Sequence, residues 1–218
     1  MKNSLKILAL AALSFLGAES TLLAGNETRN GGDAWVCESG MISVLDYSEA
    51  GDAHVDLDLG PPQGGYKEKI VYVLNRLKRL DPKRARLYHQ RIKDLFAGEG
   101  KVVYYFLPFP NIPDSHHHQD LSHCRLEQVA YQVHPNRPGG TRYFFFRKTW
   151  DRMDDLNKAG LILHEIIYRE ALEFGHTDSV RARKFNALIS SRLMDRLSSA
   201  GYLEILKELA LPVYSTRP

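Results

Sequence analysis

The strongest restriction on the fold is a continuous helical pattern over residues 157–175, NKAGLILHEIIYREALEFG. At about 100° per residue, one half of the helix surface is apolar and must face a core; it carries Ile162, Leu163, Ile166, Ile167 and Ala171. The other half carries four neighbouring polar side chains, bracketed by leucines: His164, Glu165, Tyr168 and Arg169. The pattern predicts a core helix over 157–173 with one partly desolvated polar group, which we call the helix patch.

The N-terminal sequence has the three-part pattern of a secretory signal peptide. Lys2 and Lys6 precede the apolar run 7–16 (ILALAALSFL), and small residues suited to cleavage follow near positions 20 and 24. A run of that length rises about 15 Å as a helix, roughly half the hydrocarbon core of a bilayer, so a membrane anchor is disfavoured. We expect residues 1–24 to be removed after export to the periplasm or beyond, and residues 25–218 to form one soluble α+β domain without a membrane span.

The composition excludes several classes of protein. Hydrophobic residues make up 44% of the chain and charged residues 25%, as in globular proteins, which excludes wholesale disorder. The net charge of +3 is too small to indicate a nucleic-acid partner, and no nucleic-acid-binding motif is present. Phosphate-binding glycine loops, nucleophile elbows and calcium loops are absent from the sequence. These absences argue against nucleotide enzymes and α/β-hydrolases.

The two cysteines, Cys37 and Cys124, are too few for a disulfide scaffold but can pair with each other after export. Such a disulfide would close a loop of 124 − 37 = 87 residues. The chain-entropy model assigns a loop of this size about 4–5 kcal/mol as an upper figure. Two separately buried thiols are the alternative.

The other elements are short strands and helices. A turn at 30–33 leads into a hairpin whose strands, 34–37 and 41–45, flank the loop 38–40. Residue type and apolar spacing predict strands at 102–107, 126–133 and 142–146, and helices at 70–80, 82–96, 151–173, 178–196 and 202–210. The prediction is an α+β fold, in which a small antiparallel β-sheet (a meander plus the N-terminal hairpin) packs with several α-helices.

The helix at 82–96 has a clear start, because Asp81 is suited to be its N-cap and Pro82 its first residue. Five basic residues lie along this helix: Lys83, Arg84, Arg86, Arg91 and Lys93. We expect them to form a solvated face rather than an anion-binding patch.

Three kinds of site fit the helix patch. A zinc hydrolase needs a second His four residues after His164, where Tyr168 stands instead, and His176 could join only if the chain folded back. A metal-free hydrolase would use Glu165 or His164 as its acid or base, although Arg169 would lower the pKa of Glu165. The third site is structural, because Glu165 and Arg169 have the spacing of an ion pair and His164 can contact Tyr168. We expect the structural role.

A second cluster of metal-ligating residue types occupies 114–124, DSHHHQDLSHC. Its candidate ligands include His116, His118 and His123. The spacing matches no zinc-finger or zincin pattern, and an exposed loop can be rich in His for other reasons. The sequence therefore requires no cofactor, and these three histidines are candidates only for weak binding of a metal such as zinc.

Two blocks of the sequence carry a recognisable pattern of residues. The N-terminal block is Asn30-Gly31-Gly32-Asp33 with Cys37, Leu45-Asp46-Tyr47 and Glu49-Ala50, and the C-terminal block is Leu163-His164-Glu165 with Tyr168-Arg169, Ser179 and Arg181. Together they resemble a family of uncharacterised secreted proteins from predatory Gram-negative bacteria. The family has no assigned activity, so the resemblance implies export but no mechanism. It also implies that residues from both blocks belong to one site: Asp33, His164, Glu165, Tyr168, Arg169, Ser179 and Arg181.

Two functional hypotheses follow. In the first, the chain is an exported protein without enzymatic activity, whose helix patch organises the fold or binds a cell-envelope ligand, together with Asp33, His176, Ser179 and Arg181. In the second, it is a cell-envelope hydrolase of peptidoglycan or peptides that uses Glu165 and His164, with or without a metal. A patch covered by residues 25–37 favours the first hypothesis, and an open cleft over Glu165 favours the second.

Overall fold

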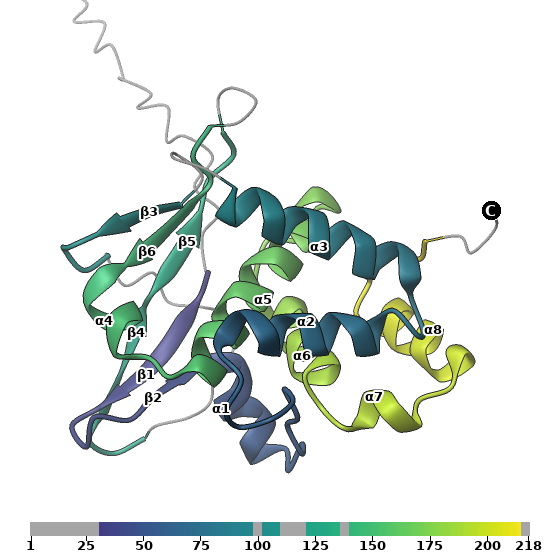
Figure 1. The fold of residues 1–218 in the computed structure, drawn as a ribbon, viewed down its shortest axis with the longest axis horizontal. Coiled ribbons are helices and arrows are strands. Elements are labelled where there is room, and N and C mark those ends of the chain that lie inside the picture. The colour runs from purple at the N-terminus through teal and green to yellow at the C-terminus, as the bar shows by residue number, and fades with distance from the viewer. Residues whose placement is uncertain (1–30, 98–101, 110–120, 136–139, 215–218) are drawn as a thin grey trace, which may run out of the picture.

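The computed structural model describes residues 31–97, 102–109, 121–135 and 140–214. Within these ranges the protein has six strands in two sheets and eight helices, which confirms the predicted α+β class. In Figure 1 both sheets lie on the left and most helices on the right, with α5 (Asp155–Glu173) between them. None of the described helices is long and apolar enough to cross a bilayer.

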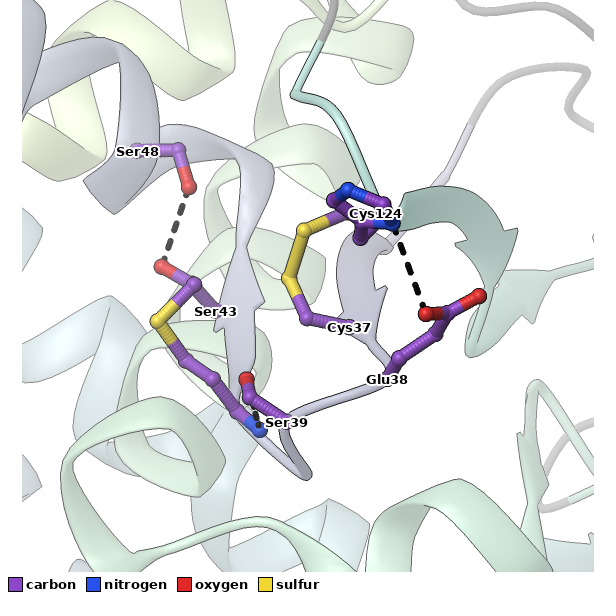
Figure 2. Close-up of a disulfide and its surroundings, with 8 residues drawn as sticks. Cys37, Glu38, Ser39, Ser43, Ser48 and Cys124 are labelled. Carbon is purple, nitrogen blue, oxygen red and sulfur yellow. Dashed lines mark hydrogen bonds and ion pairs between the residues drawn. A yellow bond between two sulfur atoms is a disulfide. The ribbon is translucent and has the colours of Figure 1, made fainter.

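The N-terminal sheet has the strand order β2-β1-β4, and its neighbouring strands are antiparallel. β1 (Asp33–Cys37) and β2 (Ile42–Val44) form the predicted hairpin, and β4 (Cys124–Gln128) pairs with the other edge of β1. Cys37 lies opposite Cys124 in this pairing, and the two form a disulfide (Figure 2). The predicted disulfide is confirmed, and it joins two strand ends that are far apart in the sequence.

The second sheet has the order β3-β6-β5, and it corrects the predicted meander. β3 (Val102–Tyr105) runs parallel to β6 (Tyr143–Phe146), whereas β5 (Ala130–Gln132) is antiparallel to β6. The strands thus belong to two three-stranded sheets, and one of these contains a parallel pair.

The single strand predicted at 126–133 is two strands, β4 and β5, in different sheets. The break is at Val129, whose N–H and that of Ala130 both donate to the Gly32 carbonyl, at 2.9 and 3.1 Å. The Val129 carbonyl accepts from the Phe146 N–H at 2.8 Å. The chain therefore changes sheets at the position where the Gly32 backbone crosses it.

Capping side chains set the helix boundaries. Asp81 caps α3 (Pro82–Phe96) as predicted, accepting from the Arg84 N–H at 2.9 Å. The predicted helix 151–173 is divided, because the Asp154 carboxylate caps a new helix, α5, after α4 (Arg147–Arg152). The remaining helices are α1 (Leu45–Asp52), which the sequence analysis missed, α2 (Tyr66–Leu77), α6 (Val180–Ile189), α7 (Leu193–Arg196) and α8 (Ser199–Glu208).

Helix α5 is enclosed by the core on nearly all sides. It contacts α1, α2, α3, α6, β2 and β5. Every side chain from Leu161 to Tyr168 is buried, so most of the helix patch is buried too. Gly160 allows α1 to approach closely, since a Cβ at this position would lie 2.5 Å from the Tyr47 ring.

Candidate functional site

Three of the four residues of the helix patch lie inside the core. His164 is 1% exposed, and Glu165 and Tyr168 are fully buried. The rings of His164 and Tyr168 are in contact as predicted, with centroids 5.8 Å apart. Because these side chains are removed from water, their polar atoms depend on partners within the protein.

The imidazole of His164 is held by a carboxylate from α1. Its Nδ1 lies 3.0 Å from Oδ1 and 2.9 Å from Oδ2 of Asp46. Asn186 of α6 donates its side-chain N–H to Asp46 Oδ2 at 2.7 Å and to the Gly160 carbonyl at 3.0 Å. Burial by itself would raise the pKa of Asp46, but the charge and hydrogen bond of His164 and the bond from Asn186 hold it below its usual value. We call these three residues, Asp46, His164 and Asn186, the Asp46 cluster; it joins α1, α5 and α6.

Glu165 contacts a different part of the molecule, between β5 and the start of β1. Its Oε2 accepts from Gln132 Nε2 at 3.1 Å. Gly32 packs against its Oε1, and a Cβ on Gly32 would lie 2.7 Å from that oxygen. Burial raises the pKa of Glu165 to about 7, against the opposing effects of His164 and Gln132. A carboxyl group with a raised pKa therefore lies inside the core, covered by the N-terminal block.

The predicted ion pair between Glu165 and Arg169 is wrong. Arg169 Nε donates instead to Glu173 Oε1 at 3.0 Å, one turn further along α5. The side chains of Arg169 and Glu173 are 24% and 43% exposed, whereas Glu165 is fully buried. The i,i+4 spacing suits both pairs, and the pair nearer the surface forms because it keeps its charges hydrated.

Ser179 and Arg183 extend the polar contacts from the Asp46 cluster toward the surface. Arg183 Nη1 donates to Ser179 Oγ at 3.0 Å, and its Nε donates to Glu49 Oε2 at 2.9 Å. The Arg183 side chain is only 2% exposed, so these partners hold a buried charge in one orientation.

A pocket of about 690 Å³ lies between α1 and α6, and we call it the α1–α6 pocket. Its polar lining has both signs of charge: Asp46, Glu49, Asp52, Arg183 and Lys184. The rest of its lining is apolar and includes Ala50, Val180, Ala187 and Leu188. Asp46 therefore connects the buried imidazole of His164 to a cavity of a size that suits small ligands.

His176 and Arg181 lie elsewhere, in the lining of a pocket of about 440 Å³ beside the end of α8. His176 Nε2 is 3.0 Å from the Ala210 carbonyl. Asp33 is 3% exposed and directly follows Gly32, so it lies near Glu165. Of the residues that the resemblance assigns to one site, five are buried, Arg169 lies nearer the surface and Arg181 lines this second pocket. None of these residues lines the α1–α6 pocket.

Of the candidate metal ligands, His123 alone falls within the described residues, and His116 and His118 lie outside them. His123 is exposed, with Nδ1 3.5 Å from Glu38 Oε2. Cys124 forms the disulfide, so it supplies no thiolate. Across the described part of the chain, no group of three or more His, Cys, Asp or Glu side chains is placed to hold a metal ion. Weak metal binding by the 114–124 loop stays a prediction.

A second buried polar group, which we call the Arg84 network, was not predicted. Arg84 is fully buried where a solvated residue was expected. Its guanidinium donates to Glu170 at 3.2 Å, to Asp81 at 2.9 Å and to the Tyr202 hydroxyl at 2.7 Å. The Tyr88 hydroxyl donates to Glu170 Oε2 at 2.6 Å. The network ties α3 to α5 and α8, and it shows that the basic residues of α3 do not form one solvated face.

A helical projection of 82–96 contains the signal for this network. Arg84, Tyr88, Arg91 and Leu95 fall within an arc of about 60°. All four are buried, so the arginines share the core-facing stripe of α3. Sequence reasoning also missed Asn186 and Arg183, because their roles depend on contacts with α1, a helix that it did not predict.

The arrangement can hold buried charges and line a ligand cavity. Glu165 and His164 line neither of the two pockets described above, so a substrate in either pocket would not meet these two side chains directly. Scans of protein-family models, curated proteins and solved structures found no match to this chain.

Proposed function

We propose that this chain is an exported binding protein without catalytic activity, in which the helix patch organises the fold and the α1–α6 pocket holds a small zwitterionic ligand. The contact between Asp46 and His164 carries this proposal. Asp46 binds the buried imidazole at 2.9 Å and also lines the pocket, so the core and the pocket share one carboxylate.

The charges of the pocket determine the class of ligand. An anion would meet the carboxylates of Asp46, Glu49 and Asp52, and a cation would meet Arg183 and Lys184. A zwitterion satisfies both sets, and the apolar part of the lining suits an aliphatic side chain. An amino acid or a short peptide has this chemistry.

Export is part of the proposal and has two supports. The first 24 residues have the signal-peptide pattern, and the Cys37–Cys124 disulfide fits an oxidising compartment. Expression in a Gram-negative host tests export by intact mass. The periplasmic protein should lack its first 20 to 24 residues, and an uncleaved cytoplasmic product would contradict export.

Binding can be tested by NMR titration of the mature protein with the dipeptide leucyl-leucine. Leucine amide, a cation, and N-acetyl-leucine, an anion, serve as single-charge controls. The dipeptide should shift the amide signals of α1 and α6 more strongly than either control does. Equal shifts from all three compounds, or no shift in α1 and α6, would contradict the proposal.

A filled pocket provides the matched variant. Ala187→Trp places an indole in the pocket, whereas Ala200→Trp places one on the exposed surface of α8. The first variant should abolish the dipeptide shifts and the second should keep them, with thermal melting confirming that both are folded. Binding that survives Ala187→Trp would place the ligand elsewhere.

Acid–base hydrolysis is the second candidate, and the pKa of about 7 at Glu165 favours it. Incubation of the mature protein with peptidoglycan and with casein, with and without a chelator, tests this activity. Products that disappear in Glu165→Gln would establish hydrolysis and overturn our preferred function. We expect no products.

A further inference from the structure

The second sheet has one buried face and one aromatic outer face. Side chains alternate along its strands, so Tyr143 and Phe145 of β6 point into the core and are at most 2% exposed. Phe144 lies between them on the outer face, stacked on Tyr131 of β5 with ring centroids 4.7 Å apart. Tyr105 of β3 adjoins Phe144 on the same face, with ring centroids 5.7 Å apart. The outer face is therefore a continuous aromatic surface.

The chain after β3 extends this surface and leaves two apolar side chains in solvent. Phe109 packs back onto the outer face, with its ring centroid 4.7 Å from that of Tyr131. Before it, Phe106 is 79% exposed and Leu107 is 75% exposed, the highest values for large apolar side chains in the described residues. In Figure 1, β3 lies at the edge of the molecule. We call Phe106 and Leu107 the tip. Exposed apolar side chains that adjoin an aromatic face indicate a contact surface.

The parallel pairing of β3 and β6 brings basic residues to the same place. Because Tyr105 lies opposite Phe146, the residues that follow the two strands leave the sheet at the same end. After β6 these are Arg147 and Lys148, which are both exposed. With Arg152 and the acidic Asp151, they give α4 a net charge of 3 − 1 = +2. The segments that carry the apolar pair and the basic pair thus leave the sheet at the same end, where Arg147 also donates to Asp151 at 2.6 Å.

We propose that this tip binds the surface of a lipid bilayer that contains anionic lipids. Phe106 and Leu107 would enter the interface between headgroups and acyl chains, where aromatic and aliphatic side chains leave water. Arg147 and Lys148 would lie at the level of the lipid phosphates. The contact is peripheral and needs no membrane-spanning helix.

The charge at the tip favours a bilayer over a second copy of this chain. A twofold contact through the tip would place two α4 helices, each with a net charge of +2, close to one another. An anionic bilayer presents negative charge over an area larger than the tip, so it attracts the same residues. The two apolar side chains are also largely exposed and follow an edge strand, which suits insertion into a soft interface.

Sedimentation of the mature protein with vesicles tests the proposal. Vesicles of phosphatidylcholine with about one third phosphatidylglycerol should bind the protein, and vesicles of phosphatidylcholine alone should bind it at least tenfold more weakly, since each basic residue near an anionic surface contributes about fivefold in affinity. The double variant F106S/L107S should lose at least tenfold in affinity for the anionic vesicles. Lys148→Gln should lose about fivefold in affinity for the anionic vesicles. Added salt should also weaken the binding of the wild-type protein to these vesicles.

Phe174→Ser is the matched control, because Phe174 is 54% exposed on another part of the molecule. This variant should bind the vesicles as the wild type does. Thermal melting should show that all the variants are folded, since the replaced side chains lie at the surface. Absence of binding to anionic vesicles, or binding that F106S/L107S leaves unchanged, would overturn the proposal. A dimer in solution that F106S/L107S converts to a monomer would also overturn it, because the tip would then bind a second copy.

Discussion

Asp46 and His164 are 118 residues apart in the sequence, yet the carboxylate of one lies 2.9 Å from Nδ1 of the other. Both side chains are 2% exposed, and the charge of His164 is the largest of the effects that lower the pKa of Asp46. Because Asp46 also lines the α1–α6 pocket, this contact couples the stability of the core to the shape of the pocket.

Glu165→Gln is expected to stabilise the protein at neutral pH. The pKa of Glu165 is raised from 4.5 to about 7 in the fold, so the folded state binds this proton more tightly than the unfolded state does. The free energy of unfolding therefore falls as the pH rises from about 4.5 to about 7, by about 3 kcal/mol in all, and Gln lacks this loss.

Urea denaturation at pH 5 and at pH 8 measures the effect. The free energy of unfolding of Glu165→Gln, relative to that of the wild type, should be higher at pH 8 than at pH 5. Glu208→Gln, an exposed control on α8, should change stability by less than about 0.5 kcal/mol at either pH. A relative stability of Glu165→Gln that does not change with pH would contradict the predicted burial of an ionisable carboxyl group.

Arg84→Met should destabilise the protein by about 3–5 kcal/mol, because it leaves the buried carboxylate of Glu170 without its counter-charge. Arg86→Met is the matched control, since Arg86 is exposed on the same helix and should cost less than about 0.5 kcal/mol. Thermal or urea denaturation distinguishes the two variants. Equal effects would mean that Arg84 is solvated, as the sequence analysis first supposed.

The contrast between these two arginines shows what the sequence could predict and what it could not. The α+β class, the N-terminal hairpin, the Asp81 cap and the disulfide depend on local pattern or on residue type, and they were predictable. The burial of Arg84 depends on partners contributed by α5 and α8. We assigned Arg84 to a solvated face because of its charge alone. Its position on the same face of the helix as Tyr88 and Leu95 indicates instead that it faces the core.

The candidate site was predictable only in part. The periodicity of 157–175 placed His164, Glu165 and Tyr168 on one helix face, and the structure confirms the contact between His164 and Tyr168. Glu165 contacts Gln132 and Gly32 instead. The partner of His164 could not be derived from periodicity, because Asp46 comes from a helix with few apolar residues. The parallel pairing of β3 and β6 was missed for a similar reason, since strand order depends on contacts over long sequence separations.

Gly32→Ala tests the close approach of the N-terminal block to Glu165. Gly32 has a φ of +46°, and its Cβ would lie 2.7 Å from both Glu165 Oε1 and the Ala130 Cβ. Gly32→Ala should therefore lose stability for two reasons, about 1–2 kcal/mol from backbone strain and about 1–3 kcal/mol from overpacking. Gly40→Ala is the control, because Gly40 has a φ of +91° with nothing within 4 Å of a Cβ, so it should show the strain alone. Equal losses in urea denaturation would mean that Gly32 does not pack against Glu165.

The disulfide should be complete in the exported protein. Under denaturing, non-reducing conditions the mature chain should take up no alkylating reagent, and mass spectrometry counts the additions. The double variant C37A/C124A should lose up to about 4–5 kcal/mol of stability, because the 87-residue loop is no longer closed in the unfolded state. Two alkyl groups per chain in the unreduced wild type would contradict the disulfide.

The most direct test of the structural role of the helix patch is a double-mutant cycle on Asp46 and His164, measured by urea denaturation at pH 7. Asp46→Asn and His164→Phe should each cost about 3–5 kcal/mol, and the double variant should recover at least about 1 kcal/mol of the sum. The exposed pair Glu38 and His123, with side chains 81% and 78% exposed, should give a coupling near zero in the same experiment. Additive effects of Asp46→Asn and His164→Phe, within about 0.5 kcal/mol, would contradict the proposed role of this contact in organising the fold.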